Sequence, residues 1–83
     1  MKILYAGSSH SSSLILESLI AGSNEVIGVI SQPDRRSKRG GATEPSYVSS
    51  VGENNNIPVY KPLALDENFK QTILKLNFDI LLV

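Results

Sequence analysis

The chain has no cysteine and no net charge. Its 83 residues carry eight basic and eight acidic side chains and a single histidine. Without cysteine, disulfides and thiolate metal sites are excluded, and a reducing compartment is permitted. A net charge of zero gives no general attraction to nucleic acid or to membranes. The composition therefore indicates one small globular domain, in which any charged binding site is a local feature.

Long apolar runs are also lacking. The longest runs span only a few residues, far fewer than a helix needs to cross a bilayer. At the amino end, "MKILYAGSSH" turns polar within seven residues, whereas a secretory signal needs a continuous apolar stretch. We therefore expect a cytoplasmic protein that has no membrane partner.

Recognisable catalytic and metal-binding motifs are scarce. Gly7 is followed by no second or third glycine, so the dinucleotide motif G-x-G-x-x-G is absent. The serine-rich turn at residues 7–13 is interpreted as a helix cap, with anion binding as the alternative. His10 has no acidic neighbour to orient it, and we expect a solvated loop residue rather than a catalytic base. Asp34 is expected to pair with Arg35 or to cap a turn. The scattered carboxylates have no metal-ligand spacing, so we assign no catalytic and no metal-binding residue.

The first 31 residues have the pattern of a strand, a helix and a strand. "KILYA" at residues 2–6 and "EVIGVIS" at residues 25–31 are short apolar runs typical of buried strands. The segment between them has helical spacing, and Gly22 stands where that helix would stop. The helix residues expected on the inward side are Leu14, Ile15 and Leu19, with Leu16 and Ile20 as further candidates.

The second half of the chain repeats this alternation. A helix is expected to begin near Pro45, a strand to span residues 57–62, and a helix capped by Asp66 to precede a fourth strand at residues 78–83. Phe69, Ile73 and Leu76 are expected to share one face of the last helix. Alternating strands and helices predict an α/β, Rossmann-like fold with a parallel sheet of about four strands and flanking helices. Because the sequence stops at the fourth strand, before the loop where such sheets hold ligands, we expect a truncated domain.

A basic loop separates the first strand–helix–strand unit from the second half of the chain. Residues 31–45 read "SQPDRRSKRGGATEP" and contain all three arginines of the chain. Its prolines and its glycine pair predict neither helix nor strand. Four positive charges lie within five residues, and guanidinium groups bind phosphate oxygens in pairs, so the loop could attract a polyanion. The residues concerned are Arg35, Arg36, Lys38 and Arg39, with Gly40 and Gly41 providing reach. A solvated surface run of charges is the alternative.

At this loop the chain begins to resemble the methionyl-tRNA formyltransferase family. The family's first strand ends in a turn similar to "YAGS", its second strand runs into "QPDR", and a basic glycine-containing loop follows. A helix that starts at a proline is matched by "EPSYVSS", and the next strand by "IPV" with a later proline. The last strand resembles "FDILLV". The resemblance covers the whole chain, and "QPDR" with the basic loop is its most specific part.

The resemblance implies transfer of a formyl group from 10-formyltetrahydrofolate to the amino group of methionyl initiator tRNA. It implies that residues 1–83 are the amino-terminal half of a Rossmann-like formyltransferase domain. It further implies that the basic loop reaches the tRNA, with Arg39 at the acceptor end and Arg35, Arg36 and Lys38 on phosphates. The family's catalytic residues, its main folate-contacting segment and its carboxy-terminal domain would all lie beyond this sequence. We therefore expect the 83-residue chain alone to be inactive.

Two other functions stay open on the sequence. One is a fragment of a nucleotide-sugar N-formyltransferase, which would not need a basic loop. The other is a non-catalytic, shortened tRNA-binding module. In each case a bare fourth strand would expose apolar surface, so self-association through that strand is expected.

Overall fold

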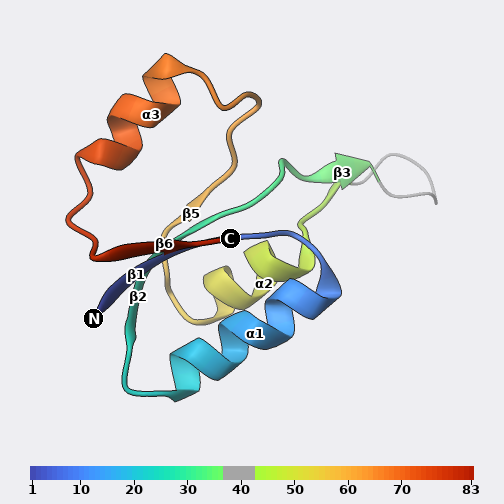
Figure 1. The fold of residues 1–83 in the computed structure, drawn as a ribbon. Coiled ribbons are helices and arrows are strands. Elements are labelled where there is room, and N and C mark those ends of the chain that lie inside the picture. Colours follow the sequence, from blue (N-terminus) through green and yellow to red (C-terminus); the bar gives the residue numbers. More distant parts are fainter. Residues whose placement is uncertain (37–42) are drawn as a thin grey trace.

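The computed structural model describes residues 1–36 and 43–83, with only the backbone of Arg35 and Arg36. The elements in chain order are β1 (Lys2–Ala6), α1 (His10–Ala21), β2 (Glu25–Ile30), β3 (Arg35–Arg36), β4 (Thr43–Glu44), α2 (Tyr47–Asn54), β5 (Val59–Tyr60), α3 (Glu67–Leu74) and β6 (Ile80–Leu82). Figure 1 shows the main strands side by side, with helices above and below them.

Four strands form one parallel sheet in the order β5-β2-β1-β6. The centre of the sheet is the pair β1–β2, in which Tyr5 lies opposite Val29. A register shift between Ile3 and Leu4 marks an irregularity in this pair. The predicted α/β, Rossmann-like parallel sheet of four strands with flanking helices is therefore confirmed.

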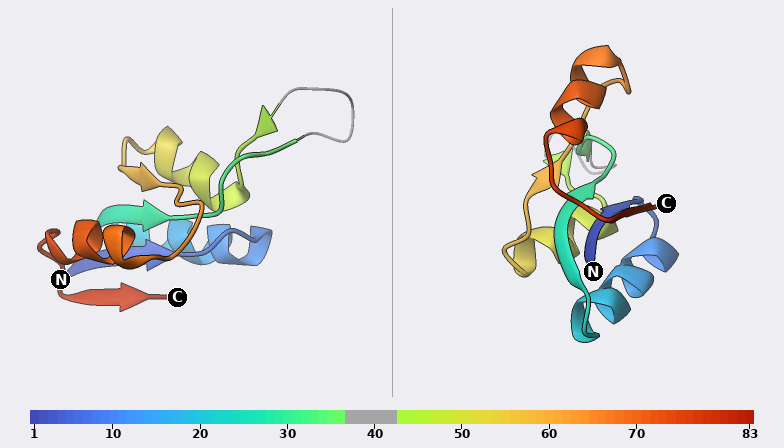
Figure 2. Two further views of the ribbon diagram at one scale, coloured as in Figure 1. Left: turned by 90° about the horizontal axis from the view of Figure 1, so that it is seen from above. Right: turned by 60° about the vertical axis from the view of Figure 1, so that its left-hand side comes forward.

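The helices cover the two faces of the sheet unequally. Helices α1 and α2 lie together on one face, and α3 lies on the opposite side, as the two further views in Figure 2 show. The core on the first face is built from Tyr5, Leu16, Val29 and Val48, all buried. Helix α3 has no buried residue. Burial of apolar area is the main stabilising force in folding, so the α1–α2 face holds the principal core.

Helix α1 is rotated from the predicted orientation. Ser13 and Leu16 are its buried residues, whereas Leu14 and Ile15 are 53% and 55% exposed. The inward assignment of Leu14 and Ile15 was therefore wrong. The helix also begins earlier than predicted, at His10, because the Ser9 side chain accepts a hydrogen bond from the Ser12 N–H and caps it.

Helix α2 packs very close to the sheet through a glycine. A Cβ atom at Gly52 would lie 2.8 Å from Val59 Cγ2 and 3.4 Å from Val29 Cγ2. The first distance is too short for a side chain beside a stiff, β-branched valine, whereas 3.4 Å is an ordinary contact. Gly52 therefore sets how closely α2 approaches β5 and β2. The predicted start of this helix near Pro45 is confirmed, with Ser46 as its cap.

The last helix and strand follow the predicted pattern. The Asp66 carboxylate accepts a hydrogen bond from the Phe69 N–H, 3.0 Å away, and caps α3 as expected. Phe69, Ile73 and Leu76 are the half-buried residues on and just after this helix. None of the helices in residues 1–36 and 43–83 is long and apolar enough to span a membrane.

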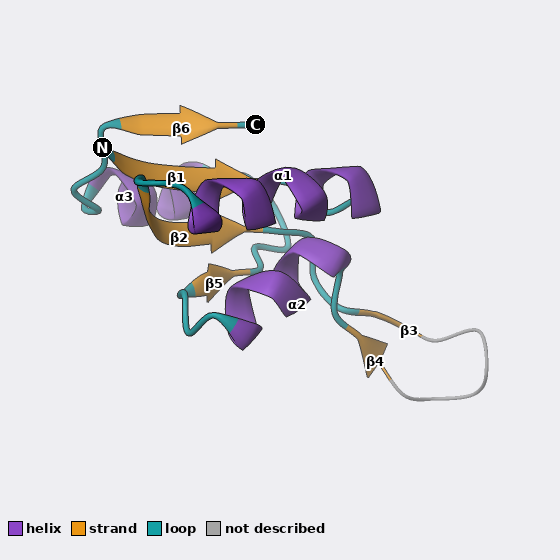
Figure 3. Cartoon of the chain, turned by 90° about the horizontal axis from the view of Figure 1, so that it is seen from below, coloured by secondary structure: helices purple, strands orange, loops and turns teal. Residues whose placement is uncertain are grey.

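The basic segment is not wholly irregular, which corrects the sequence prediction. The backbone of Arg35 and Arg36 forms β3, which pairs in antiparallel fashion with Glu44 and Thr43 of β4. We call this two-stranded ladder (Arg35–Arg36 and Thr43–Glu44) the stem. Figure 3 shows the stem extending away from the end of the sheet. Lys38, Arg39, Gly40 and Gly41, which were predicted to bind tRNA, lie outside the described residues.

Candidate functional site

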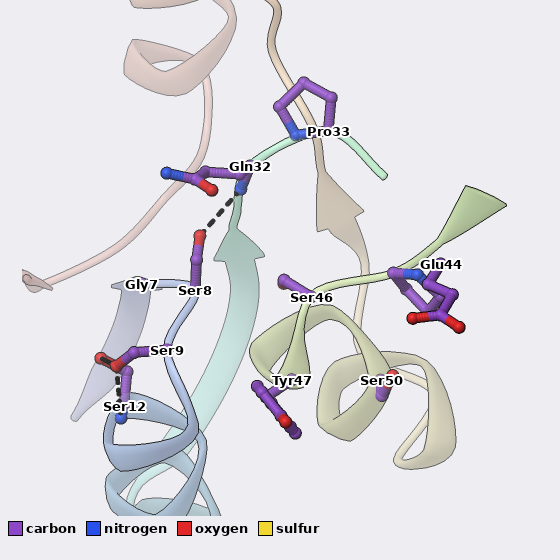
Figure 4. A pocket seen from close by; sticks show the side chains of 11 residues that line it. Gly7, Ser8, Ser9, Ser12, Gln32, Pro33, Glu44, Ser46, Tyr47 and Ser50 are labelled. Atoms are coloured by element: carbon purple, nitrogen blue, oxygen red, sulfur yellow. Dashed lines mark hydrogen bonds between the residues drawn. The ribbon is translucent and has the colours of Figure 1, made fainter. Parts of the chain in front are cut away.

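A groove opens at the carboxyl ends of β1 and β2. It has a volume of about 910 Å³ and lies between the turn that leaves β1, the segment that leaves β2, and the start of α2. Figure 4 shows polar side chains from these three segments around it. The lining residues are Gly7, Ser8, Ser9, Ser12, Gln32, Pro33, Glu44, Pro45, Ser46, Tyr47 and Ser50. In open α/β sheets this is the edge at which ligands bind.

Serine hydroxyls join the three segments of the groove. The Ser8 and Ser31 hydroxyls are 3.1 Å apart, and Ser31 is also hydrogen-bonded to the Ser46 hydroxyl. Ser46 in turn donates to the Ser49 hydroxyl at 3.0 Å. The Gln32 N–H donates to Ser8 Oγ at 3.0 Å. Because Ser31 and Ser49 are almost fully buried, at 5% and 0% exposed, this network fixes the wall of the groove.

Two helix starts converge on the groove. Ser9 caps α1 and Ser46 caps α2, so the first N–H groups of both helices face this end of the sheet. The His10 and Tyr47 rings, one from each helix start, are tilted against each other with centroids 5.1 Å apart. His10 is therefore an exposed residue of the first helical turn, and the predicted loop position was wrong. The partial positive charge of helix starts makes this edge compatible with a polar or anionic ligand.

No group of three or more His, Asp or Glu side chains in residues 1–36 and 43–83 is arranged to hold a metal ion. His10 contacts the Tyr47 ring and takes no part in the ion pairs formed by Lys61, Asp34 and Glu53. What the edge offers is hydroxyl and N–H groups that can position a ligand.

The predicted tRNA-binding residues are associated with the stem. Arg35 and Arg36 form β3, and residues 37–42 connect them in sequence to β4. Glu44, at the end of β4, lines the groove, so the stem starts and ends beside it. The fold thus brings the backbone of Arg35 and Arg36 to the same edge of the sheet as the two helix starts.

Sequence reasoning missed an ion-pair cluster at the base of the stem. Lys61 Nζ lies 2.8 Å from Asp34 Oδ1 and 3.0 Å from Glu53 Oε1. The sequence suggested a local partner for Asp34, whereas the structure gives it one that is 27 positions away. The hydrogen bonds that Lys61 donates to the Asp34 carboxylate and, to a smaller extent, to Glu53 raise the pKa of Lys61 above its ordinary value of 10.5. While both carboxylates are ionised, the stabilisation from the Lys61 ammonium group is therefore fully present below pH 10.5, and it is lost as the pH rises through the raised pKa.

The chain is similar to methionyl-tRNA formyltransferases from several bacteria. The chain is 44% identical over 84 residues to methionyl-tRNA formyltransferases of Buchnera aphidicola subsp. Acyrthosiphon pisum, strains Tuc7 and 5A. It is 41% identical over 85 residues to the methionyl-tRNA formyltransferase of Prochlorococcus marinus strain MIT 9211. The matches cover the whole chain, which spans 27% and 25% of the length of these relatives, at their amino-terminal part. No family model matches the chain. The resemblance to methionyl-tRNA formyltransferases is thus confirmed over the full length of the chain.

Proposed function

We propose that residues 1–83 form the amino-terminal half of a formyltransferase domain. The whole enzyme would transfer a formyl group from 10-formyltetrahydrofolate to the amino group of methionyl initiator tRNA. The observation that carries this proposal is the identity of 41–44% to methionyl-tRNA formyltransferases along the entire chain. In this proposal the enzyme acts in the cytoplasm, in translation initiation.

In this proposal the basic segment contacts the tRNA. The stem leaves the sheet at its carboxyl edge, beside the groove, and its strand β3 consists of Arg35 and Arg36, which Lys38 and Arg39 follow closely in the sequence. Arginine and lysine bind phosphate oxygens, and a chain of zero net charge concentrates its attraction for RNA at such a cluster. The proposed tRNA-contacting residues are Arg35, Arg36, Lys38 and Arg39, with Gly40 and Gly41 between the cations and β4.

The chemistry itself would depend on residues beyond this sequence. Attack of an α-amino group on a formyl carbon needs a base and a donor that stabilises the oxyanion. The groove provides neutral hydroxyls and helix N–H groups, which suit positioning rather than proton transfer. We assign no described residue to 10-formyltetrahydrofolate, and we expect the 83-residue chain alone to give no turnover.

The apolar edge of the sheet suggests a further property of the isolated chain. Strand β6 is at one end of the sheet order, and its Ile80 and Leu81 are 37% and 43% exposed. Exposed edge strands pair readily with other chains. We therefore propose that the chain self-associates through β6, and sedimentation equilibrium that gave a monomer at all concentrations would exclude this.

The proposed substrate can be tested by titration of the 83-residue chain. We expect methionyl initiator tRNA to bind with an affinity that falls steeply with salt, because phosphate contacts release counterions. A nucleotide-linked amino sugar, titrated under the same conditions, should cause no chemical-shift change in the NMR spectrum. Binding of the sugar without binding of tRNA would instead favour a nucleotide-sugar N-formyltransferase.

A further inference from the structure

The ammonium group of Lys61 connects the base of the stem to the main domain. Asp34 immediately precedes β3, Lys61 immediately follows β5, and Glu53 lies near the end of α2. Lys61 Nζ contacts both carboxylates, at 2.8 Å and 3.0 Å. One side chain therefore joins the entry to the stem with a strand and a helix of the main domain.

The stem is joined to the main domain through the segments at its two ends, and on the segment after β4 Ser46 is hydrogen-bonded to Ser31 and Ser49. The strands of the stem pair with each other and form a sheet separate from the four-stranded one. On the chain leading into it, the Ser31 N–H donates to the Tyr60 carbonyl at 2.9 Å and the Gln32 N–H donates to Ser8 Oγ. Asp34 is the next residue after Pro33, so its carboxylate is the last side-chain anchor before β3 begins.

The geometry points to Lys61 as a positioning residue: its pairs with Asp34 and Glu53 set the direction in which the stem leaves the sheet. The part of this inference that concerns RNA rests on the proposed function, since a directed stem would present Arg35 and Arg36 to a phosphate backbone. Lys61 and Asp34 are partly exposed, at 27% and 34%, and exposed pairs contribute little to global stability. Loss of the pairs should therefore change the placement of the stem without unfolding the domain.

The substitution Asp34→Asn distinguishes an effect of stem placement on RNA binding from an effect of net charge. It removes a negative charge beside the basic segment, so electrostatics alone would strengthen RNA binding. Positioning by Lys61 predicts the opposite, a loss of tRNA affinity of about threefold to tenfold, because the stem must then be ordered during binding. The matched control is Glu17→Gln on α1, which makes the same charge change at an exposed site away from the cluster. Lys61→Arg should bind tRNA with wild-type affinity, and Lys61→Gln should bind it more weakly.

A second measurement needs no RNA. The chain has no cysteine, so spin labels can be attached to Thr43→Cys on β4 and Ser18→Cys on α1 alone. Pulsed electron spin resonance should show a distance distribution that broadens or shifts with Asp34→Asn and stays unchanged with Glu17→Gln. An unchanged distribution with Asp34→Asn, or tighter tRNA binding by that variant, would overturn the role of Lys61. A changed distribution in a chain that binds no tRNA would support the positioning role and would count against the proposed function alone.

Discussion

Replacement of Arg36, Lys38 and Arg39 together by alanine is expected to weaken tRNA binding about 100-fold at 0.1 M salt. Each cation that neutralises a phosphate contributes roughly 0.7 to 0.9 to the slope of log affinity against log salt concentration. Three lost contacts should therefore reduce that slope by about two to three. Affinity measured by filter binding or fluorescence anisotropy, at several salt concentrations, gives both quantities.

The control for this triple variant removes cations elsewhere. Lys70 lies on α3, Lys75 is its C-cap, and both are exposed. Figure 1 places α3 away from the stem. Lys70→Ala with Lys75→Ala should leave the salt slope close to that of the wild-type chain. Equal losses in the two variants would mean that general charge, rather than the basic segment, binds the RNA.

The largest effect on stability is expected from Leu16→Ala. Leu16 is 0% exposed and belongs to the core cluster between α1 and the sheet. Removal of a buried leucine side chain costs about 2–5 kcal/mol in the free energy of unfolding, through lost transfer energy and the cavity left behind. Since small domains have total stabilities of about 5–15 kcal/mol, the variant should be close to unfolding at room temperature. Urea titration followed by circular dichroism measures the change.

Leu14→Ala provides the matched comparison. Leu14 is two positions away on the same helix, but it is 53% exposed. Its truncation should change the free energy of unfolding by no more than about 0.5 kcal/mol. If Leu14→Ala destabilised the chain as much as Leu16→Ala, the orientation of α1 described above would be wrong.

The comparison of these two leucines shows which features of the fold could be predicted from the sequence. Alternation of apolar runs with helical segments was enough to predict the four parallel strands and the three helices. It was not enough to identify the buried side of α1, because apolar residues surround most of that helix. They are Leu14, Ile15, Leu16, Leu19 and Ile20. The side that the helix buries includes Ser13, a small polar residue, together with Leu16.

The candidate site was predictable only in part. The "QPDR" motif and the cations after it identified the basic region. The prolines and glycines of residues 31–45 argued against a strand there, so the short antiparallel pairing of β3 with β4 was not predicted. The Asp34–Lys61 contact had no local signal, since it forms only when β5 is placed beside β2. The serine network likewise joins residues that only the folded sheet brings together. Long-range polar contacts of this kind require the tertiary structure.

A chimeric enzyme tests the central claim most directly. In the Buchnera aphidicola methionyl-tRNA formyltransferase, the residues that align with this chain would be replaced by residues 1–83. The measured quantity is formyl-methionine produced from 10-formyltetrahydrofolate and methionyl initiator tRNA, with the thermal melt of the chimera as the control for folding. We predict that the chimera is active and that kcat/KM falls when it also carries Arg36→Ala, Lys38→Ala and Arg39→Ala. A folded chimera that formylates no tRNA, or whose kcat/KM is unchanged by the three substitutions, would contradict the proposed role.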